Sequence, residues 1–377
     1  MDALTTPSNW QRVRLGDILT LKHGRDYKNF KLGNIPVYGS GGYMLSINNF
    51  LHNGESVCIG RKGTIDKPIY LNGKFWVVDT LFYSYSFKKS IPKFIFYAFS
   101  IIKWSNYNEA TGVPSLTKMT ISNIEILLPP LNEQIAIANI LSGVDRYLYS
   151  LDALILKKES VKKALSFELL SQRKRLKGFN QAWQRVRLGT YKYRRGSFPQ
   201  PYGNPQWYSD NGMPFVQVYD VGENFKLTQK TKQKISKIAQ PMSVFVPKNS
   251  VIITLQGTIG RVALTQYDCY CDRTILIFDN NTLNDVNKYF FVLSLFTKFE
   301  EEKRKADGSI IKTITKQTLK DFEILLPPLN EQIAIANILS ALDHEIISLK
   351  NKKRQFENIK KALNHDLMSA KIRVLKK

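Results

Sequence analysis

The stretch Glu125–Ser142 reads EILLPPLNEQIAIANILS, and Glu323–Ser340 repeats the same eighteen residues without a difference. The paired prolines disfavour helix before them and suit a helix entry. Asn132 is a plausible N-cap, and the carboxylate of Glu133 favours the positive end of a helix. An identical repeat 198 positions away indicates that the chain needs the same helix start in two places.

Each repeat leads into a pattern typical of a coiled coil, because apolar residues continue at three- and four-residue spacing. The sequence predicts that the first helix runs from Leu131 to Leu176, about 69 Å at 1.5 Å per residue, and stops at Gly178. Since neither helix can bury its seam alone, we expect the two to pair; packing of each helix on its own domain is the alternative. The seam residues are Leu141, Val144, Leu148, Leu151, Ile155, Leu165 and Leu169, then Leu339, Leu342, Ile346, Leu349, Phe356, Leu363 and Leu367, with lysines interrupting at 158, 162, 353 and 360.

A second repeat, WQRVRLG, occupies Trp10–Gly16 and Trp183–Gly189. The segments between these openings and the long helices, residues 17–124 and 190–322, differ in length and sequence. Both are rich in short apolar runs bounded by Gly and Asn, which are typical of strands. The expected strands are Ile35–Tyr38, Ser56–Ile59, Pro68–Leu71, Phe75–Val78, Phe215–Tyr219, Met242–Val246, Val251–Leu255 and Thr274–Phe278; the expected helices are Ile91–Lys103 and Val286–Phe299.

The predicted fold class is therefore α+β with an internal pseudo-twofold repeat. Two mixed, strand-rich α/β domains, residues 1–124 and 179–322, would be joined by two long antiparallel coiled-coil helices, residues 125–178 and 323–377. The fixed segments would serve each other or a common partner, and the variable segments would serve different targets.

The charge balance points to a polyanionic ligand. The chain has 55 Lys and Arg against 31 Asp and Glu, a net charge of +24, and each variable segment carries seven more basic than acidic residues. Such a balance is most often a sign of nucleic-acid binding. The three cysteines fit inert thiols in a reducing compartment. With neither a signal-peptide pattern nor an apolar run of membrane-spanning length, we expect a cytoplasmic protein without membrane attachment.

The sequence lacks the marks of an enzyme. It contains no phosphate-binding loop, no Gly-x-Gly-x-x-Gly stretch and no Asn-Pro-Pro-Tyr or Asp-Pro-Pro-Tyr stretch. The four histidines have no Cys or acidic partner at ligand spacing, so no metal site is expected. We therefore predict no catalytic residue, no metal and no cofactor on this chain.

Glycine-flanked turns with basic or amide side chains are the best candidates for DNA contact, because Gly lets a backbone approach phosphate and Arg or Gln can pair with base edges. The turn at Gly60–Ile65 has a counterpart at Leu255–Arg261 that differs in its polar side chains, as expected for readers of different sequences. An ordinary surface turn is the alternative. The candidate residues are Arg25, Tyr43, Arg61, Lys62, Thr64, Lys118, Arg194, Arg195, Gln256, Thr258, Arg261, Lys312 and Lys316.

The order of these motifs resembles the specificity subunit of type I restriction-modification systems over almost the whole chain. The marks are the Trp-x-x-Val-x-Leu-Gly openings, the Val37–Tyr43 loop, the Gly-Thr-Ile turns and the duplicated Leu-Pro-Pro-Leu-x-Glu-Gln helix starts. The resemblance implies a non-catalytic subunit with two target-recognition domains, each reading one half of a split site in double-stranded DNA, with the coiled coil setting the spacing.

The resemblance also implies partners. Two methyltransferase subunits, which would carry S-adenosylmethionine, are expected to dock on the fixed helices, and motor-nuclease restriction subunits would complete the complex. Carried over by residue, the docking positions are Leu131, Asn132, Glu133, Gln134, Leu329, Asn330, Glu331 and Gln332. Local helix caps are the alternative for the Glu and Gln. Alternative functions are the specificity subunit of a related two-subunit methyltransferase-nuclease and a stand-alone DNA methyltransferase.

Overall fold

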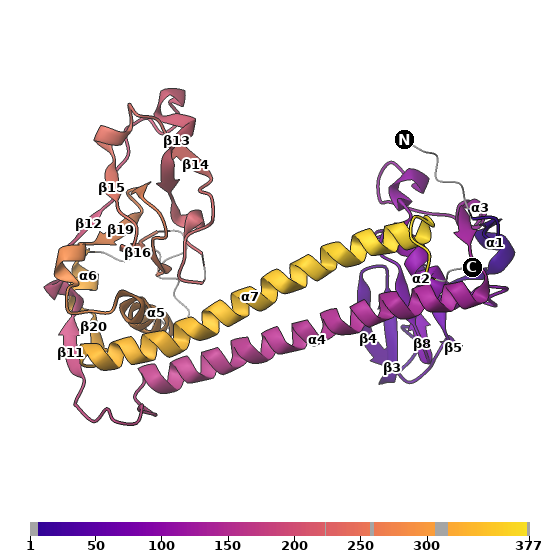
Figure 1. The fold of residues 1–377 in the computed structure, drawn as a ribbon, viewed down its shortest axis with the longest axis horizontal. Helices are drawn as coiled ribbons and strands as arrows, with labels where there is room; N and C mark the ends of the chain where they lie inside the picture. The colour runs from indigo at the N-terminus through magenta and orange to yellow at the C-terminus, as the bar shows by residue number, and fades with distance from the viewer. Residues whose placement is uncertain (1–6, 223, 257–259, 306–315, 375–377) are drawn as a thin grey trace. The chain divides into compact units, whose positions relative to one another are not determined.

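A computed structural model describes residues 7–222, 224–256, 260–305 and 316–374 of the chain. The chain folds into two compact units. Unit 1 contains the residues up to Ile155 and those from Ser348 onward, and unit 2 contains Leu156–Ile347. Each unit combines one strand-rich domain with the beginning of one long helix and the end of the other (Figure 1).

Unit 1 is built on two four-stranded sheets, ordered β2-β9-β6-β7 and β4-β3-β8-β5, and a two-stranded ribbon, β1-β10. Its strands are β1 (Gln11–Arg14), β2 (Thr20–His23), β3 (Leu32–Gly39), β4 (Gly42–Ile47), β5 (His52–Asn53), β6 (Ser56–Gly60), β7 (Ile69–Leu71), β8 (Lys74–Val77), β9 (Leu81–Tyr85) and β10 (Glu125–Leu128). Its helices are α1 (Leu15–Ile18), α2 (Pro92–Ile101) and α3 (Lys118–Asn123). It also contains the first part of α4, which as a whole spans Leu131–Leu170, and the last part of α7, which spans Leu329–Met368.

Unit 2 repeats this plan with sheets ordered β12-β19-β16-β17 and β14-β13-β18-β15 and a ribbon, β11-β20. Its strands are β11 (Gln184–Arg187), β12 (Tyr193–Arg195), β13 (Tyr208–Val216), β14 (Gln233–Ile235), β15 (Val244–Val246), β16 (Val251–Thr254), β17 (Val262–Leu264), β18 (Cys269–Cys271), β19 (Ile275–Phe278) and β20 (Glu323–Leu326). Its helices are α5 (Lys288–Lys305), α6 (Lys316–Asp321) and the first part of α7 (Leu329–Met368).

The two domains are copies of one fold in register as well as in order. Ile59 of β6 pairs with Phe82 of β9, and Ile253 of β16, 194 positions later, pairs with Leu276 of β19 in the same antiparallel manner. The second sheet also keeps its one parallel pair, β3 with β8 and β13 with β18. Every expected strand overlaps a strand of the structure, which confirms the predicted strand-rich α/β domains. Only Phe215–Tyr219 is largely wrong, because β13 ends at Val216 and Val218–Asp220 forms a 3-10 turn.

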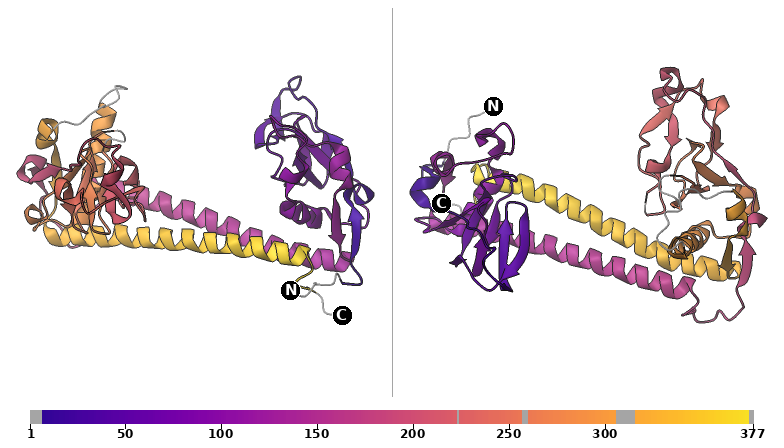
Figure 2. Two further views of the ribbon diagram at one scale, coloured as in Figure 1. Left: turned by 90° about the horizontal axis from the view of Figure 1, so that it is seen from above. Right: turned by 180° about the vertical axis from the view of Figure 1, so that it is seen from behind.

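The long helices run antiparallel, as expected from the heptad pattern. In each unit the beginning of one helix lies beside the end of the other (Figure 2). Ile137 and Leu141 of α4 share a core with Leu367 of α7 in unit 1, and Leu339 of α7 shares one with Leu169 of α4 in unit 2. These cores also contain domain residues, so the helix ends pack both on each other and on the domain.

The predicted end of the first helix at Leu176 is wrong by six residues. Helix α4 ends at Leu170, because Gln172 adopts a left-handed backbone with φ of 60° and the amide of Lys174 turns back to the carbonyl of Glu168. Helix α7 ends in the same way at Met368, with Ala370 at φ 60°. Gln172 and Ala370 are 198 positions apart, so the helix stop belongs to the repeat although neither residue is Gly.

The two repeated motifs pair with each other in space. Strand β1, from the first WQRVRLG, is antiparallel to β10, from the first EILL, with Gln11 opposite Leu128 and Arg14 opposite Glu125. The second copies form β11 and β20 in the same register. The ends of each variable segment therefore meet on a constant two-stranded ribbon that leads directly into the long helix.

Within the described part of the chain, every helix is too short or too polar to cross a membrane.

Candidate nucleic-acid and partner interfaces

The Arg61 turn is fixed by close contacts within unit 1. It follows β6, and a Cβ on Gly60 would lie 2.0 Å from the carbonyl oxygen of Thr64, so the tight path requires Gly there. Arg61 Nε donates to the Asp79 carbonyl oxygen at 2.7 Å, and its guanidinium lies 3.7 Å from the Asp79 carboxylate. Lys62 is exposed and Thr64 half-buried. The turn thus presents cationic groups on a rigid support.

The same turn brings further basic groups together. The Leu116 amide donates to the Arg61 carbonyl oxygen, so the turn lies against the segment that enters α3, where Lys118 is the first residue. Burial lowers the pKa of His23, and the positive charges of Lys118 and Arg61 lower it further. Arg61, Lys118 and His23 therefore lie near one another in unit 1.

The counterpart turn in unit 2 carries different side chains. Leu255, which corresponds to Arg61 by strand register, is buried, and Gln256, which corresponds to Lys62, is exposed. Arg261 is half-buried and donates from Nη1 to the Val221 carbonyl oxygen at 3.1 Å. Thr258 and the Gly257–Ile259 match lie outside the described residues. The two turns occupy the same place in the fold with different polar chemistry.

A second basic site, beside Gly24 in unit 1, has an equivalent beside Gly196 in unit 2. Gly24 and Gly196 each pass so close to a carbonyl oxygen that a Cβ would lie 2.0 or 2.2 Å from it. Beside them, Arg25, Arg194 and Arg195 are exposed, and Arg194 Nη2 donates to the Phe245 carbonyl oxygen at 3.1 Å.

The remaining candidates are spread over other surfaces. Tyr43 is exposed on the β3–β4 hairpin, and its hydroxyl lies 3.1 Å from Ser46 Oγ. Lys316 is the first residue of α6, the counterpart of α3. Lys312 lies outside the described residues.

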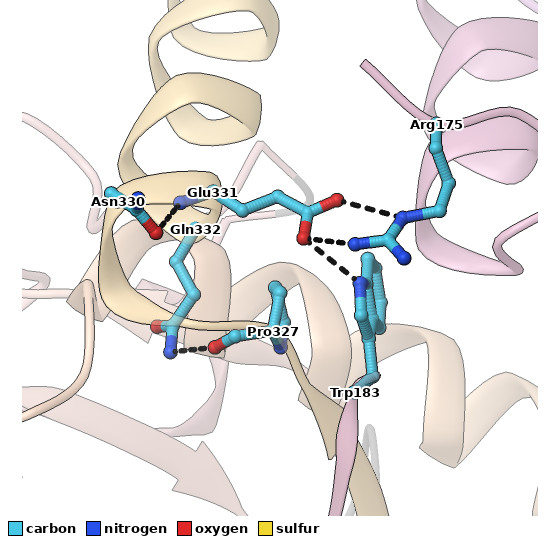
Figure 3. Close-up of polar contacts among 6 residues, drawn as sticks. All are labelled: Arg175, Trp183, Pro327, Asn330, Glu331 and Gln332. Carbon is cyan, nitrogen blue, oxygen red and sulfur yellow. Dashed lines mark hydrogen bonds and ion pairs between the residues drawn. The ribbon is translucent and has the colours of Figure 1, made fainter. Parts of the chain in front are cut away.

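The repeated glutamates form a buried clasp that sequence reasoning missed. Glu133 is 2% exposed and Glu331 1% exposed. Arg175, just past the end of α4, donates to Glu331 from Nε at 3.2 Å and from Nη2 at 2.6 Å, and Trp183 Nε1 donates to the same carboxylate at 3.2 Å (Figure 3). Helix α7 thus begins bound to the end of α4 and to the second Trp-x-x-Val-x-Leu-Gly opening.

Unit 1 has the same clasp with the roles of the helices exchanged. Arg373, just past the end of α7, donates to Glu133 at 2.7 and 3.0 Å, and Trp10 Nε1 donates to it at 3.1 Å. Arg175 and Arg373 are 198 positions apart, like the glutamates. Each clasp therefore joins one helix start, the opposite helix end and one repeated opening.

The repeated glutamines connect the fixed frame to the variable domain. Gln134 Oε1 accepts the Ile91 amide at 3.0 Å, and Gln332 Oε1 accepts the Asn287 amide at 2.9 Å. Ile91 and Asn287 immediately precede α2 and α5, so each glutamine caps a domain helix. The carboxamide nitrogens bond the Pro129 and Pro327 carbonyl oxygens. The glutamine side chains thus serve as caps within the chain, and they are not exposed to a partner.

An apolar face remains exposed on both helix starts. Ile135 is 48% exposed and Ile333 41% exposed, and each lies one turn after an exposed leucine, Leu131 or Leu329. Asn132 and Asn330 are exposed beside them. In unit 2, Leu329 also borders a hollow of about 590 Å³, lined partly by residues of β11, β20 and the paired prolines and partly by residues of the variable segment such as Tyr191 and Asp285. Repeated, solvent-facing apolar residues are a feature of interaction surfaces.

No reactive centre emerges among the described residues. Cys58, Cys269 and Cys271 are buried and free, and burial raises the pKa of the Cys58 thiol to about 12. Within the same part of the chain, His, Cys, Asp and Glu side chains do not gather into a group able to hold a metal ion.

Comparison with known proteins points in one direction. Residues 7–162 and 196–358 match the model of the type I restriction modification DNA specificity domain. The chain is 25% identical to the type I restriction enzyme MjaVIII specificity subunit of Methanocaldococcus jannaschii, over 99% of this chain and 95% of that protein. It is 28% identical to the MjaX specificity subunit of the same organism, described as putative, over 75% of this chain and 68% of that protein.

Solved structures share the fold. The S subunit of a type I restriction-modification system from M. genitalium has a TM-score of 0.68 at 15% identity, covering 97% of this chain and 98% of that one. A chain from a study of type I restriction-modification assembly and conformational transition has a TM-score of 0.57 at 17% identity, covering 97% and 99%.

Proposed function

Because this chain belongs to the family of type I restriction-modification DNA specificity subunits, we propose that its two domains each read one half of a bipartite, asymmetric DNA site. A specificity subunit is the non-catalytic component that recognises the DNA target. We further propose that the paired helices hold the two half-sites at a fixed spacing. The repeated helix starts would dock two methyltransferase subunits, and motor-nuclease subunits would complete the complex.

One observation carries the proposal for two readers. The Arg61 turn and the Gln256 turn occupy equivalent places in domains of identical sheet order and register, yet they present different hydrogen-bonding groups. Arginine favours paired bonds to guanine, and glutamine to adenine. A constant frame with exchanged polar side chains is what two readers of different half-sites need.

The Arg61→Ala variant should lose recognition of one half-site only, and Gln256→Ala of the other. A good base contact contributes about 1–3 kcal/mol, so modification at the affected half should fall roughly 10–100-fold. Sequencing of methylated DNA from the complex assembled with each variant measures this. Arg12→Ala is the control, since it removes an equal charge from an exposed position on the fixed ribbon. Losses spread evenly over both half-sites would refute the assignment of one reader per domain.

The docking proposal rests on the exposed apolar residues, because the Glu and Gln side chains of the repeat bond within the chain. An Ile135→Glu variant should lose one methyltransferase subunit and Ile333→Glu the other, each weakened about 30-fold if the residue is a binding hot spot worth about 2 kcal/mol. The stoichiometry of the complex by native mass spectrometry would fall from two to one. Tyr149→Glu is the matched control, because Tyr149 is 78% exposed on α4 outside the repeat. Equal loss with this control would point to general repulsion and against the docking surface.

A further inference from the structure

A three-helix junction in each unit lies beyond the repeated stretch and involves the variable domains. In unit 1, Tyr97 of α2 is fully buried, and its hydroxyl donates to Asp145 Oδ2 of α4 at 2.6 Å. Lys360 of α7 forms an ion pair with the same carboxylate. Asn364 Nδ2 of α7 also donates to the Tyr97 carbonyl oxygen at 3.2 Å. Three helices, one from the domain and two from the frame, therefore meet at one aspartate.

Unit 2 contains the same three-helix junction. Tyr289 of α5 donates to Asp343 of α7, and Lys162 of α4 forms an ion pair with that carboxylate. The Asp343 and Lys162 side chains are each 18% exposed, so the junction is largely shielded from water. The frame residues are equivalent, because Asp145 and Asp343, like Lys162 and Lys360, are 198 positions apart although the helices around them have diverged.

The tyrosines, in contrast, come from different turns of the domain helices. The glutamine caps make Ile91 equivalent to Asn287. Tyr289 is therefore equivalent to Lys93, and Tyr97 lies one turn further along its helix. Both domain helices therefore place a tyrosine hydroxyl on the aspartate, but the tyrosine stands at a different position in each helix. A contact that persists while its residue moves indicates a requirement for the contact itself.

We propose that the Tyr97–Asp145–Lys360 and Tyr289–Asp343–Lys162 junctions are positioning devices that fix the angle of each recognition domain on the helix pair and so restrict the DNA spacer lengths accepted. The inference rests on the proposed function. The glutamine cap holds one end of each domain helix, and the junction holds a second point. The domain also packs on the helix ends through the shared apolar core, and the junction adds a directional polar contact that this packing does not supply.

The spacer is sensitive to such an orientation. Adding one base pair moves one half-site by about 3.4 Å and turns it by about 35° around the DNA axis. A domain with the junction intact should resist that turn, and a domain without it should turn more readily toward the displaced half-site. The half-site sequences, read by side chains elsewhere in the domain, should stay the same.

The test uses the complex of the full chain with its methyltransferase subunits and duplexes carrying the bipartite site found by methylation sequencing, with the spacer shortened, unchanged or lengthened by one base pair. Wild type should modify the altered duplexes far more slowly than the unaltered one. In Tyr97→Phe the ratio of the modification rate on the unaltered duplex to that on the altered duplexes should fall about tenfold. This is the effect of losing one hydrogen bond to a charged group. Asp145→Asn should act in the same direction, and Tyr289→Phe tests unit 2 independently.

Two variants separate positioning from general stability. Asp152→Asn removes the Lys353 ion pair between the same two helices without touching α2, and it should leave the spacer profile unchanged. The double variant Lys93→Tyr with Tyr97→Phe places the hydroxyl where unit 2 has it, and it should restore the wild-type profile.

A Tyr97→Phe profile identical to wild type, or an equal change in Asp152→Asn, would overturn the inference. Methylation sequencing that finds no bipartite site for the wild-type complex would overturn the proposed function, and the inference with it.

Discussion

Replacing Arg175 by alanine should lower the free energy of unfolding of unit 2 by about 3 kcal/mol, the low end of the cost of breaking a buried ion pair. Glu331 is 1% exposed in the folded chain. Without Arg175, its carboxylate keeps only the Trp183 indole as a clasp partner. Arg175 itself is 25% exposed, so part of the interaction is already screened by water. For a unit of this size the melting temperature should fall by about 6–12 °C. Arg373→Ala should have the same effect on unit 1.

The control for Arg175→Ala is Lys174→Ala, which removes a neighbouring charge that is 73% exposed and lies 3.8 Å from Glu168. Thermal unfolding monitored by circular dichroism, with hydrogen exchange at the start of α7, measures the difference. Replacing Arg175 by Met together with Glu331 by Leu should recover most of the stability, because no buried charge is then left unpaired. If Arg175→Ala and Lys174→Ala melt alike, the clasp does not hold the frame together.

The sequence predicted the parts of the fold that depend on local pattern. Heptad spacing located both long helices, and short apolar runs bounded by Gly and Asn located the strands that form the two domains. The end of α4 was predicted wrongly because Gly178 is the residue type that usually stops a helix, whereas Gln172 takes the left-handed conformation. A stop in the same place 198 residues later, at Ala370, shows that a residue other than Gly can take this conformation in both copies.

The clasps could not be predicted from spacing, since Trp10 and Glu133 are 123 positions apart and Trp183 and Glu331 are 148 apart. One usable signal was present. Arg175 and Arg373 keep the 198-residue offset beyond the identical stretch, where most neighbours differ. A retained arginine opposite a retained glutamate indicates an ion pair once the helices are known to be antiparallel.

The lysines that interrupt the predicted seam also have a physical reason. Lys158 pairs with Glu345 in unit 2, and the equivalent place in unit 1 holds Tyr147 packed on Phe356, with ring centroids 4.6 Å apart. An aromatic side chain paired with a charged one would be unfavourable at either place. The two pairs therefore favour one alignment of the helices over the alternative in which the two ends are exchanged. The heptad pattern alone located these positions without revealing their partners.

Shortening both long helices by one heptad should shorten the accepted DNA spacer and leave both half-site sequences unchanged. Removing Tyr149–Ile155 from α4 and Leu349–Gln355 from α7 takes out Asp152 and Lys353 together. It keeps the heptad phase, both clasps and both three-helix junctions. Each helix loses about 10 Å at 1.5 Å per residue. At 3.4 Å per base pair, the spacer should shorten by about three base pairs.

The control removes Tyr149–Ile155 alone. The remaining helix would then be a heptad longer than its partner, so the clasps at the two ends could not both form. This variant should lose stability and modification activity without acquiring a new spacer.

Methylation sequencing of DNA modified by the complex that contains the doubly shortened chain tests the central claim most directly. Two independent readers on a rigid helical frame predict the two original half-sequences separated by about three fewer base pairs. An unchanged spacer, or changed bases in either half-site, would contradict that account.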